Sequence, residues 1–528
     1  MASSKDEKIL KSKFTKELTA IAKTFAKKFN KQPIDITRNF YRKMSKLGEA
    51  YDSIWGSFSI MKEDILGKSS QDPKFTRDSI TGVKNDSSKK SKRRYFVTAA
   101  IAGQSINRLF LASIESFCAL LGAELVILPM YGVLKKDEEY PDELKQMADH
   151  MVSEYIFNSN LRAFDVMLKP QHVIPLTGLP RLGQKNSSII VASPKQQMRV
   201  VPISNRKLPH IIHSTGCINI PDTYTYTRIG VLGRQDHIQG GLIVEIQDDE
   251  IFHIRQVQAD DKGGFSYLNK YYQGDKVEDA EVEAFVLGDY HAGFHDESAV
   301  KAWLEVTELC NPKHLLLHDL FDGYSISHHH ENDLKVKVNL PEHVSTLERE
   351  LATVSQEIRR WQKKFPKLNL VVVRSNHDEH LDRYLTEGRF IKDPANLMLS
   401  LDLAKESFTF KNPLEEYLRV KHGIENVRWL KRDEDFKVAG IQLGRHGDKG
   451  MNGARGSVHS TELAFGRAVV GHAHTPQIFR ETWVVGTTSI MDRDYMKGHP
   501  SSWLHTSCLV YKNGQRSLVT SISGNWRI

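Results

Sequence analysis

The chain has 528 residues, of which 40% are hydrophobic and 26% charged, and its formal net charge is +8. This length allows two or three domains with a sizeable core, and the composition is that of an ordinary globular protein. No run approaches the roughly 18–20 apolar residues of a membrane span, and charged residues interrupt the N-terminus where a signal peptide would be apolar. We therefore expect no membrane partner and a cytoplasmic location, which would be the host cytoplasm if the protein is viral. The four cysteines are far apart and predict reduced, buried thiols.

The positive charge is concentrated near the N-terminus. Residues 1–70 hold 15 Lys or Arg against 8 Asp or Glu, and residues 84–94 hold six against one. Apolar residues at three- and four-residue steps predict a basic helical region over 1–70, followed by a basic linker over 71–94. These helices could bind the phosphates of a nucleic acid, or they could present a solvated lysine face while packing on the rest of the chain.

Residues 95–278 predict an accessory α/β domain. A strand over 95–102, a helix over 106–121 and a strand over 124–130 form a βαβ pattern, which is typical of two parallel strands joined by a crossover. Further strands are predicted at 188–192, 199–202, 211–213, 227–232 and 241–247. This region contains no catalytic constellation, so we expect it to position substrate or support the rest of the chain.

Residues 279–528 repeat one pattern five times: a short apolar run of the kind that forms a buried strand ends at a polar cluster. The runs start at Val282, Leu315, Leu370, Val438 and Ala468. The clusters are Asp289-Tyr-His291, Asp319-Leu-Phe-Asp322, Asn376-His-Asp378, His446-Gly-Asp448 and His472-Ala-His474. In α/β sheets, ligands gather beyond the carboxyl ends of the strands, so we expect the clusters to form one site.

The side chains in these clusters suit divalent metal ions. Two Asp carboxylates, one Asn carbonyl and four imidazoles, without any thiolate, favour borderline ions such as Mn, Fe, Zn or Co. Seven ligands are too many for one tetrahedral ion, whereas two ions that share a carboxylate would use them all. Paired metal ions of this kind stabilise the attacking and leaving oxygens in phosphoryl transfer.

This order of motifs resembles the calcineurin-like metallophosphoesterase superfamily, and within it the SbcD-type DNA repair nucleases. The resemblance covers roughly the second half of the chain. It implies an α/β catalytic domain over 279–528, built as a two-sheet sandwich flanked by helices. It also implies one ion held by Asp289, His291 and His474, a second held by Asn376, His446 and His472, and Asp319 bridging them. His377 would lie over the scissile phosphate as an acid or charge stabiliser, oriented by Asp378.

Two residues depart from the family pattern. The family usually has glycine before the bridging Asp and before the Asn, where this chain has His318 and Ser375. Both changes place a side chain where the family packs its backbone closely, so we expect the local loop geometry to differ while the ligands remain in place.

The resemblance implies a metal-dependent nuclease that hydrolyses DNA phosphodiester bonds with a hydroxide activated between two ions. Manganese is the first choice of metal, with Mg, Fe or Zn as alternatives. The alternative function is a phosphatase or phosphodiesterase for a phosphoprotein or a small phosphoester, and a third is a non-catalytic DNA-binding scaffold. DNA is the expected partner, with a homo-oligomer or a separate ATPase as further partners, because no Walker glycine loop occurs in this chain. The unusual N-terminal half suggests a phage-encoded, DNA-degrading enzyme.

Several residues near the clusters are candidate substrate contacts or packing elements. Arg445 and Arg455 could clamp a phosphate, and His328, the first of three consecutive histidines, could contact substrate, bind an extra metal or simply be exposed. The apolar stripe over 344–361 predicts a crossover helix between parallel strands. Closing strands are predicted at 483–485, 503–511 and 517–522, the last two joined by an Asn-Gly hairpin turn.

Overall fold

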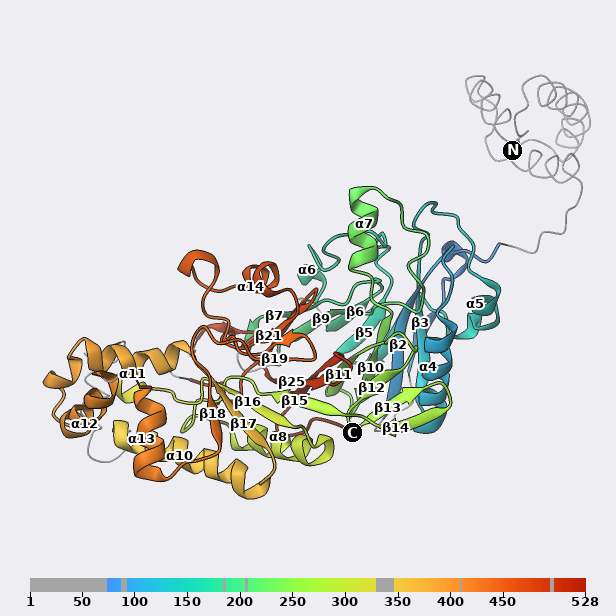
Figure 1. The fold of residues 1–528 in the computed structure, drawn as a ribbon. Helices are drawn as coiled ribbons and strands as arrows, with labels where there is room; N and C mark the ends of the chain where they lie inside the picture. The colour runs from blue at the N-terminus through green and yellow to red at the C-terminus, as the bar shows by residue number, and fades with distance from the viewer. Residues whose placement is uncertain are drawn as a thin grey trace, which may run out of the picture. The chain divides into compact units, whose positions relative to one another are not determined.

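The computed structural model describes residues 74–86, 93–183, 187–204, 208–328, 346–408, 411–493 and 498–528. The chain divides into two compact units, Met1–Lys74 and Phe75–Ile528. The helices predicted over 1–70 lie outside the described residues, so the description below concerns the second unit. That unit is a mixed α/β structure with several multi-stranded sheets (Figure 1). Within the described ranges, no helix is both long and apolar enough to cross a membrane.

A six-stranded sheet carries the first three motif loops. Its order is β18-β17-β16-β15-β25-β26, in which β15 to β18 run parallel and β25 and β26 run antiparallel to their neighbours. The strands are β15 (Val282–Val286), β16 (His314–His318), β17 (Asn369–Val373), β18 (Val427–Trp429), β25 (His505–Tyr511) and β26 (Arg516–Ser521). The predicted hairpin at the end of the chain is therefore confirmed.

Two helices follow strands of this sheet and cover one of its faces. Helix α8 (Glu297–Cys310) comes between β15 and β16, and α10 (Leu347–Lys364) comes between β16 and β17, as the apolar stripe predicted. Alternate strand residues such as Phe285 and Leu317 share a core with these helices. Their neighbours, such as Val286 and Leu316, instead join a second core that contains residues of the other sheets. The period of two along each strand produces this division between the two faces.

An eleven-stranded sheet joins the two halves of the second unit. Its order is β1-β4-β5-β6-β9-β7-β22-β23-β21-β20-β19. The strands are β1 (Val83–Asn85), β4 (Glu154–Asn158), β5 (Leu161–Phe164), β6 (Ser188–Val191), β9 (His210–Ser214), β7 (Met198–Val201), β22 (Gln477–Phe479), β23 (Thr482–Val484), β21 (Ala468–Val470), β20 (Ile441–Gln442) and β19 (Lys437–Val438). Strand β7 pairs with β22 through Met198 and Ile478, so strands from both sides of the boundary predicted at 278/279 share one sheet.

The predicted βαβ pattern is confirmed in a separate four-stranded sheet of order β11-β10-β2-β3. Strands β2 (Arg93–Ile101) and β3 (Glu124–Met130) are parallel and are connected by α4 (Arg108–Leu121). Strands β10 (Gly240–Ile246) and β11 (Phe252–Gln258) complete the sheet. Because β2 begins at Arg93, the last two residues of the predicted linker belong to this sheet, where the Arg94 guanidinium donates to Glu245.

One predicted strand is wrong. Residues 227–232 lie in helix α7 (Arg228–Gln235), whose start is capped by the Thr227 hydroxyl, which accepts a hydrogen bond from Gly230 N–H. The β-branched side chains of Ile229 and Val231, which suggested a strand, are exposed on this helix. A local cap therefore outweighs the weak strand preference of the run. The run after Val438 is also interrupted, because Ala439 and Gly440 take positive φ and separate β19 from β20.

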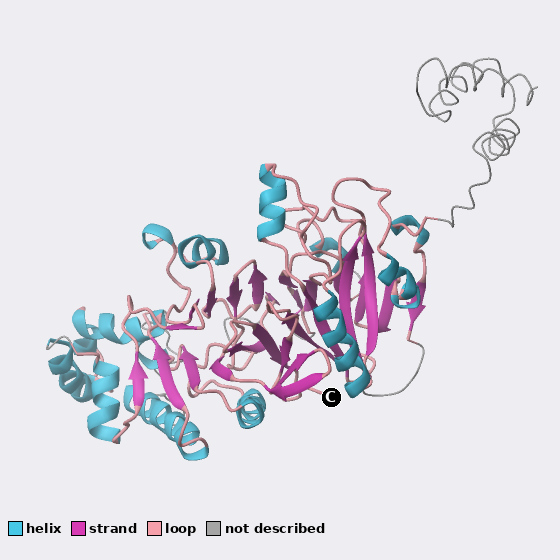
Figure 2. Cartoon of the chain, turned by 45° about the vertical axis from the view of Figure 1, so that its right-hand side comes forward, coloured by secondary structure: helices cyan, strands magenta, loops and turns pink. Residues whose placement is uncertain are grey.

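Several of the other helices follow the parallel strands of the six-stranded sheet. Helices α10 to α13 gather at one end of the second unit in both views (Figures 1 and 2), with α11 (Asn376–Thr386), α12 (Leu397–Phe408) and α13 (Pro413–His422) following β17. The other helices are α5 (Asp142–Gln146), α6 (Pro180–Gly183) and α14 (Val458–Phe465). The small sheets consist of β12 (Phe265–Tyr267), β13 (Lys270–Gln273) and β14 (Lys276–Asp279), and of β8 (Ile203–Ser204) with β24 (Pro500–Ser501).

Candidate metal centre

The first two motif loops are joined by backbone hydrogen bonds just beyond the ends of β15 and β16. Tyr290 N–H donates to the carbonyl of His318 over 2.9 Å, and His291 N–H donates to the carbonyl of Asp319 over 2.8 Å. The third loop follows β17, which is the parallel neighbour of β16. The parallel order of the strands therefore places these loops at the same edge of the sheet.

Four predicted ligands form the first group. Potential ligand atoms of Asp289, His291, Asp319 and His474 all lie within 4.8 Å of one another, and all four residues are buried. The Nε2 atom of His474 is 3.1 Å from Asp289 Oδ2 and 3.2 Å from His291 Nε2. Two imidazoles and two carboxylates that converge in this way could hold a divalent ion.

A second group shares Asp319 with the first. Ligand atoms of Asp319, His446 and His472 lie within 4.8 Å of one another, and His446 Nε2 is 3.2 Å from Asp319 Oδ2. The His446 and His472 loops are joined because Gly471 N–H donates to the carbonyl of His446 over 2.8 Å. Gly471 is required here, since a Cβ atom at that position would collide with Asp289 Oδ1.

Asn376 and His377 begin helix α11, directly after β17. Ser375 caps this helix in a capping box: its N–H donates to Asp378 Oδ2 over 2.9 Å, and its hydroxyl accepts from Asp378 N–H. The Ser375 side chain thus fixes the start of the helix. The His377 ring centroid lies 4.8 Å from that of His291, which brings this motif to the same site.

The orientation of His377 differs from the expectation. Its Nδ1 lies 2.6 Å from the backbone carbonyl of Asp322, so Nδ1–H donates to that oxygen, whereas the hydrogen bonds of the Asp378 carboxylate go to the helix cap. The Asp322 carboxylate in turn lies 2.7 Å from His291 Nδ1 and receives a hydrogen bond from Arg493 over 3.2 Å. Asp322 belongs to the DxxD motif, so its spacing from Asp319 was the sequence feature that could have identified it as a residue of this site. Nothing in the sequence pointed to Arg493.

Four of the predicted ligands have a strained backbone. His291, Asp319, His472 and His474 have φ values of 50°, 43°, 71° and 56°. Positive φ is uncommon for residues other than glycine and persists only where the surroundings enforce it. Such strain gathers at functional sites, which agrees with a site whose geometry is held in place before any ligand binds.

The charges of the site are set by burial and by the close contact of carboxylates with imidazoles. Burial alone would raise the pKa of Asp289, but the hydrogen bond from His474 and the charges of His446 and His474 together outweigh burial and lower this pKa to about 2. Burial would likewise lower the pKa of His446, yet the neighbouring Asp319 carboxylate raises it to about 9. The pKa values of His291 and His472 are lowered, mainly by burial. Both carboxylates are thus ionised, His446 carries a proton, and His291 and His472 are neutral.

Several donor atoms of this set are buried without a hydrogen-bond partner. They include Asp319 Oδ1 and Asn376 Oδ1. Buried polar atoms are normally paired, so a convergent group of unpaired lone-pair donors requires an explanation. Divalent metal ions could supply the missing partners, and the mixture of nitrogen and oxygen ligands at the site suits such ions.

One protein similar to the chain comes from a phage. No family model matches the chain. The chain is 28% identical over 472 residues to "Protein A1" of Escherichia phage T5, and the match covers 83% of each protein. Because it covers 83% of the chain, this similarity includes residues on both sides of position 279.

The predicted substrate contacts lie in different surroundings. The Arg445 guanidinium donates to Asp435 over 2.7 Å and to the carbonyl of Arg432 over 2.8 Å. Arg455 is exposed on the loop that follows the His446 motif. His328 is also exposed, and its ring lies 5.7 Å from that of His380, which lies 5.2 Å from that of His377. The other two histidines of that run lie outside the described residues.

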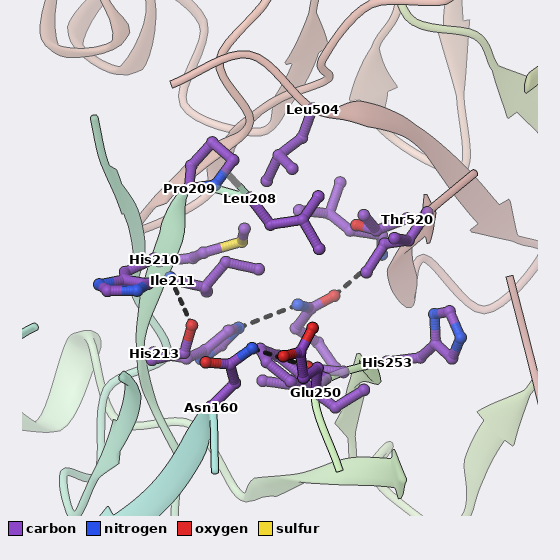
Figure 3. A pocket seen from close by; sticks show the side chains of 17 residues that line it. Asn160, Leu208, Pro209, His210, Ile211, His213, Glu250, His253, Leu504 and Thr520 are labelled. Atoms are coloured by element: carbon purple, nitrogen blue, oxygen red, sulfur yellow. Dashed lines mark hydrogen bonds between the residues drawn. The ribbon is translucent and has the colours of Figure 1, made fainter. Parts of the chain in front are cut away.

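A small cavity elsewhere is separate from this site. It lies between β9, β11 and β26 and is lined by apolar side chains together with His210, His213 and His253 (Figure 3). Its volume of about 40 Å³ has room for only a few waters. His213 is satisfied there by Gln256, 2.9 Å away, so the cavity is a packing feature of the core.

Metal binding should become tighter as the pH rises. His446 carries a proton below its pKa of about 9 in the metal-free protein, and an ion must displace that proton to reach Nε2. His291 and His472, with lowered pKa values, release none near neutrality. We expect the association constant for Mn²⁺ to rise about tenfold per pH unit between pH 6.5 and 8.5. Calorimetric titration in buffers of different ionisation enthalpy measures both the affinity and the released proton, and an affinity that does not change with pH would contradict this assignment.

Proposed function

We propose that the protein is a metal-dependent nuclease that hydrolyses DNA phosphodiester bonds, with the catalytic domain of a calcineurin-like metallophosphoesterase. One observation carries this proposal. Two groups of side chains that could bind metal, all buried except the half-buried His472, meet at the single carboxylate of Asp319, whose Oδ1 has no hydrogen-bond partner. A shared carboxylate between two ligand groups is the arrangement that paired ions need.

In this proposal the ligands divide as the two groups suggest. One ion would be held by Asp289, His291 and His474 and the other by Asn376, His446 and His472, and Asp319 would be a ligand shared by both. Two divalent ions, manganese first among them, would supply a water of lowered pKa and neutralise charge on the phosphate. The His and Asp residues fix the positions of both ions before substrate arrives, because buried contacts and backbone strain define their geometry.

His377 is proposed to protonate the leaving oxygen. Its Nδ1–H is engaged by the Asp322 carbonyl, so Nε2 is the nitrogen that remains for substrate. Burial would lower its pKa, but the carboxylates of Asp319 and Asp322 outweigh burial and raise it above the usual value, which keeps a proton available. Asp378 supports this role indirectly, because it holds the start of α11 through the capping box.

The choice of DNA as substrate rests on charge. The surplus of lysine and arginine in residues 1–70 suits a phosphate backbone. Arg455 and His328 are exposed residues close in sequence to the motif loops, and we propose them as phosphate contacts. The contact proposed for Arg445 would require its guanidinium to leave Asp435. The similarity to a phage protein supports an enzyme that works in the host cytoplasm, and a homo-oligomer or an ATPase partner is proposed from the sequence alone.

A nuclease assay across metals tests the proposal. The full chain would be incubated with circular DNA, end-labelled duplex and bis-p-nitrophenyl phosphate in Mn²⁺, Mg²⁺, Zn²⁺ or Ca²⁺, with an Asp289→Asn variant as the inactive control. Cleavage of DNA in Mn²⁺ that disappears in the variant is the expected result. Strong hydrolysis of the small ester with intact DNA would favour the alternative, a phosphatase or phosphodiesterase for a phosphoprotein or small phosphoester.

A further inference from the structure

His318 lies behind the second ligand group and contacts the proposed ligand His446. It is the last residue of β16, directly before Asp319, and its side chain is fully buried. Its ring stacks on that of His446, with centroids 5.5 Å apart and planes inclined by 30°. The two Nδ1 atoms are 3.3 Å apart. A Cβ atom at Gly471 would lie 3.1 Å from His318 Cγ, so the ring also packs against the backbone just before His472.

The two nitrogens of His446 face different partners. Nε2 points towards Asp319, 3.2 Å from Oδ2, which is the side of the ligand group. Nδ1 points towards His318 Nδ1. A metal-binding imidazole must offer a lone pair on one nitrogen and carry its proton on the other, where a hydrogen-bond acceptor usually fixes it. In the described structure, the neighbour that meets His446 Nδ1 is an imidazole rather than a carbonyl or carboxylate.

Only one proton fits between the two Nδ1 atoms, since one must donate and the other must accept. If His446 Nδ1 carries the proton, His318 accepts it with its own Nδ1 lone pair, and His446 Nε2 is free to bind an ion. The reverse arrangement would put the proton of His446 on Nε2, the atom that faces Asp319. The position of this proton therefore decides which side of the His446 ring can bind metal.

We infer that His318 is a positioning residue for the metal centre: by accepting the Nδ1–H of His446, it fixes the ring orientation and tautomer that present His446 Nε2 to the second ion. This inference rests on the proposed function, because it assumes that His446 is a metal ligand. It also explains why a bulky side chain stands where the resembling family has glycine. The His318 ring fills the space where that family packs its backbone closely, and its Nδ1 supplies a hydrogen-bond acceptor that glycine lacks.

The geometry also defines a rival role for His318. Its ring nitrogens are within 4.8 Å of ligand atoms of Asp289 and His446, so it could itself hold a metal ion through Nε2, which has no hydrogen-bond partner. Two substitutions separate these roles. His318→Asn places an amide oxygen near the position of Nδ1, whereas His318→Gln extends its amide towards the position of Nε2. His318→Leu is a matched apolar control that offers neither atom.

To test this inference, Mn²⁺ binding to the full-length protein and to the three variants is measured by equilibrium dialysis and electron paramagnetic resonance. We expect His318→Leu and His318→Gln to weaken one of two Mn²⁺ sites by about 10- to 100-fold, the effect of losing an outer hydrogen bond to a ligand. The spectrum of a coupled Mn²⁺ pair would then give way to that of a single ion. The His318→Asn variant should instead keep the Mn²⁺ affinity and the coupled spectrum of the unaltered protein.

Each other outcome overturns the inference. Retention of both sites in His318→Leu would show that the ring has no positioning role, and rescue by His318→Gln but not by His318→Asn would make it a ligand through Nε2. Absence of a Mn²⁺ pair in the unaltered protein would overturn the proposed function itself, so the two failures are distinguishable. Thermal unfolding without metal identifies a variant that is merely misfolded, and the comparison of Asn with Gln stands even if the Leu variant fails to fold.

Discussion

Replacing Asp319 with Asn should abolish the coupled metal pair and lower DNA hydrolysis by about 10³-fold or more. The substitution preserves shape but removes the one carboxylate that both ligand groups share. Paired ions contribute several kcal/mol to stabilising a phosphoryl transition state, and about 1.4 kcal/mol corresponds to a factor of ten in rate. The loss should appear in the rate at saturating Mn²⁺ and in the number of Mn²⁺ ions bound at equilibrium.

Asp402→Asn is the matched control for this change. Asp402 is exposed on α12 and pairs with Lys405, an ion pair of a kind that contributes at most about 1 kcal/mol. The Asp402→Asn substitution should leave both Mn²⁺ binding and DNA hydrolysis unaltered. If Asp319→Asn retained two Mn²⁺ ions of normal affinity, the assignment of Asp319 as the shared ligand would have to be abandoned.

Replacing His377 with Ala should lower the rate of DNA hydrolysis by about 10²- to 10⁴-fold while Mn²⁺ binding stays normal. The reason is that the ring is proposed to supply a proton to the leaving oxygen rather than a ligand to an ion. p-Nitrophenolate is a good leaving group that needs no proton. The rate for bis-p-nitrophenyl phosphate should therefore fall far less than the rate for DNA, and steady-state kinetics on both substrates measures the difference.

His380→Ala provides the comparison, because His380 lies one helical turn away on α11 and its ring is 5.2 Å from that of His377. We expect only a small change in either rate for that variant. An equal fall for both substrates in His377→Ala, or a loss of bound Mn²⁺, would mean that His377 serves the metal centre and not the leaving group.

Local patterns predicted much of the fold. Strand β3 was expected over Glu124–Met130 and is found there, and the stripe that predicted α10 does bury Leu351, Val354, Ile358 and Trp361. These elements combine strong periodicity with one buried face, so the sequence and the packing favour the same structure. Helix α7 shows the opposite case, because a short β-branched run carries little strand preference once Thr227 caps a helix.

The pairing of distant strands could not be read from local patterns. Strands β7 and β22 are neighbours in the sheet although they are far apart in the sequence. Their strand pairing consists of Met198 opposite Ile478. Nothing in either short run specifies its partner, because any buried apolar strand could take that place. The domain boundary predicted at 278/279 rests on composition and motif content, whereas hydrogen bonding continues across it.

The candidate site was easier to predict than its supporting contacts. The first three ligand motifs follow neighbouring parallel strands, whose ends meet at one edge of a sheet, so sequence order alone implied their proximity. The His446 and His472 motifs follow β20 and β21 of the eleven-stranded sheet, so the same argument does not place them beside the first three. The group that orients His377 could not be predicted, because it depends on the conformation of the loops. The carbonyl of Asp322, rather than the carboxylate of Asp378, faces His377 Nδ1. The contact between His318 and His446 joins residues 128 positions apart, which no local spacing could indicate.

The proposed activity requires a pair of metal ions held around Asp319. This claim is tested by titrating the full-length protein with Mn²⁺. Electron paramagnetic resonance monitors the titration, and metal analysis of the dialysed protein counts the bound ions. We predict two ions per chain with the spectrum of a coupled pair, and a single uncoupled ion or none in Asp319→Asn. One isolated ion per chain in the unaltered protein, or none at all, would contradict the account.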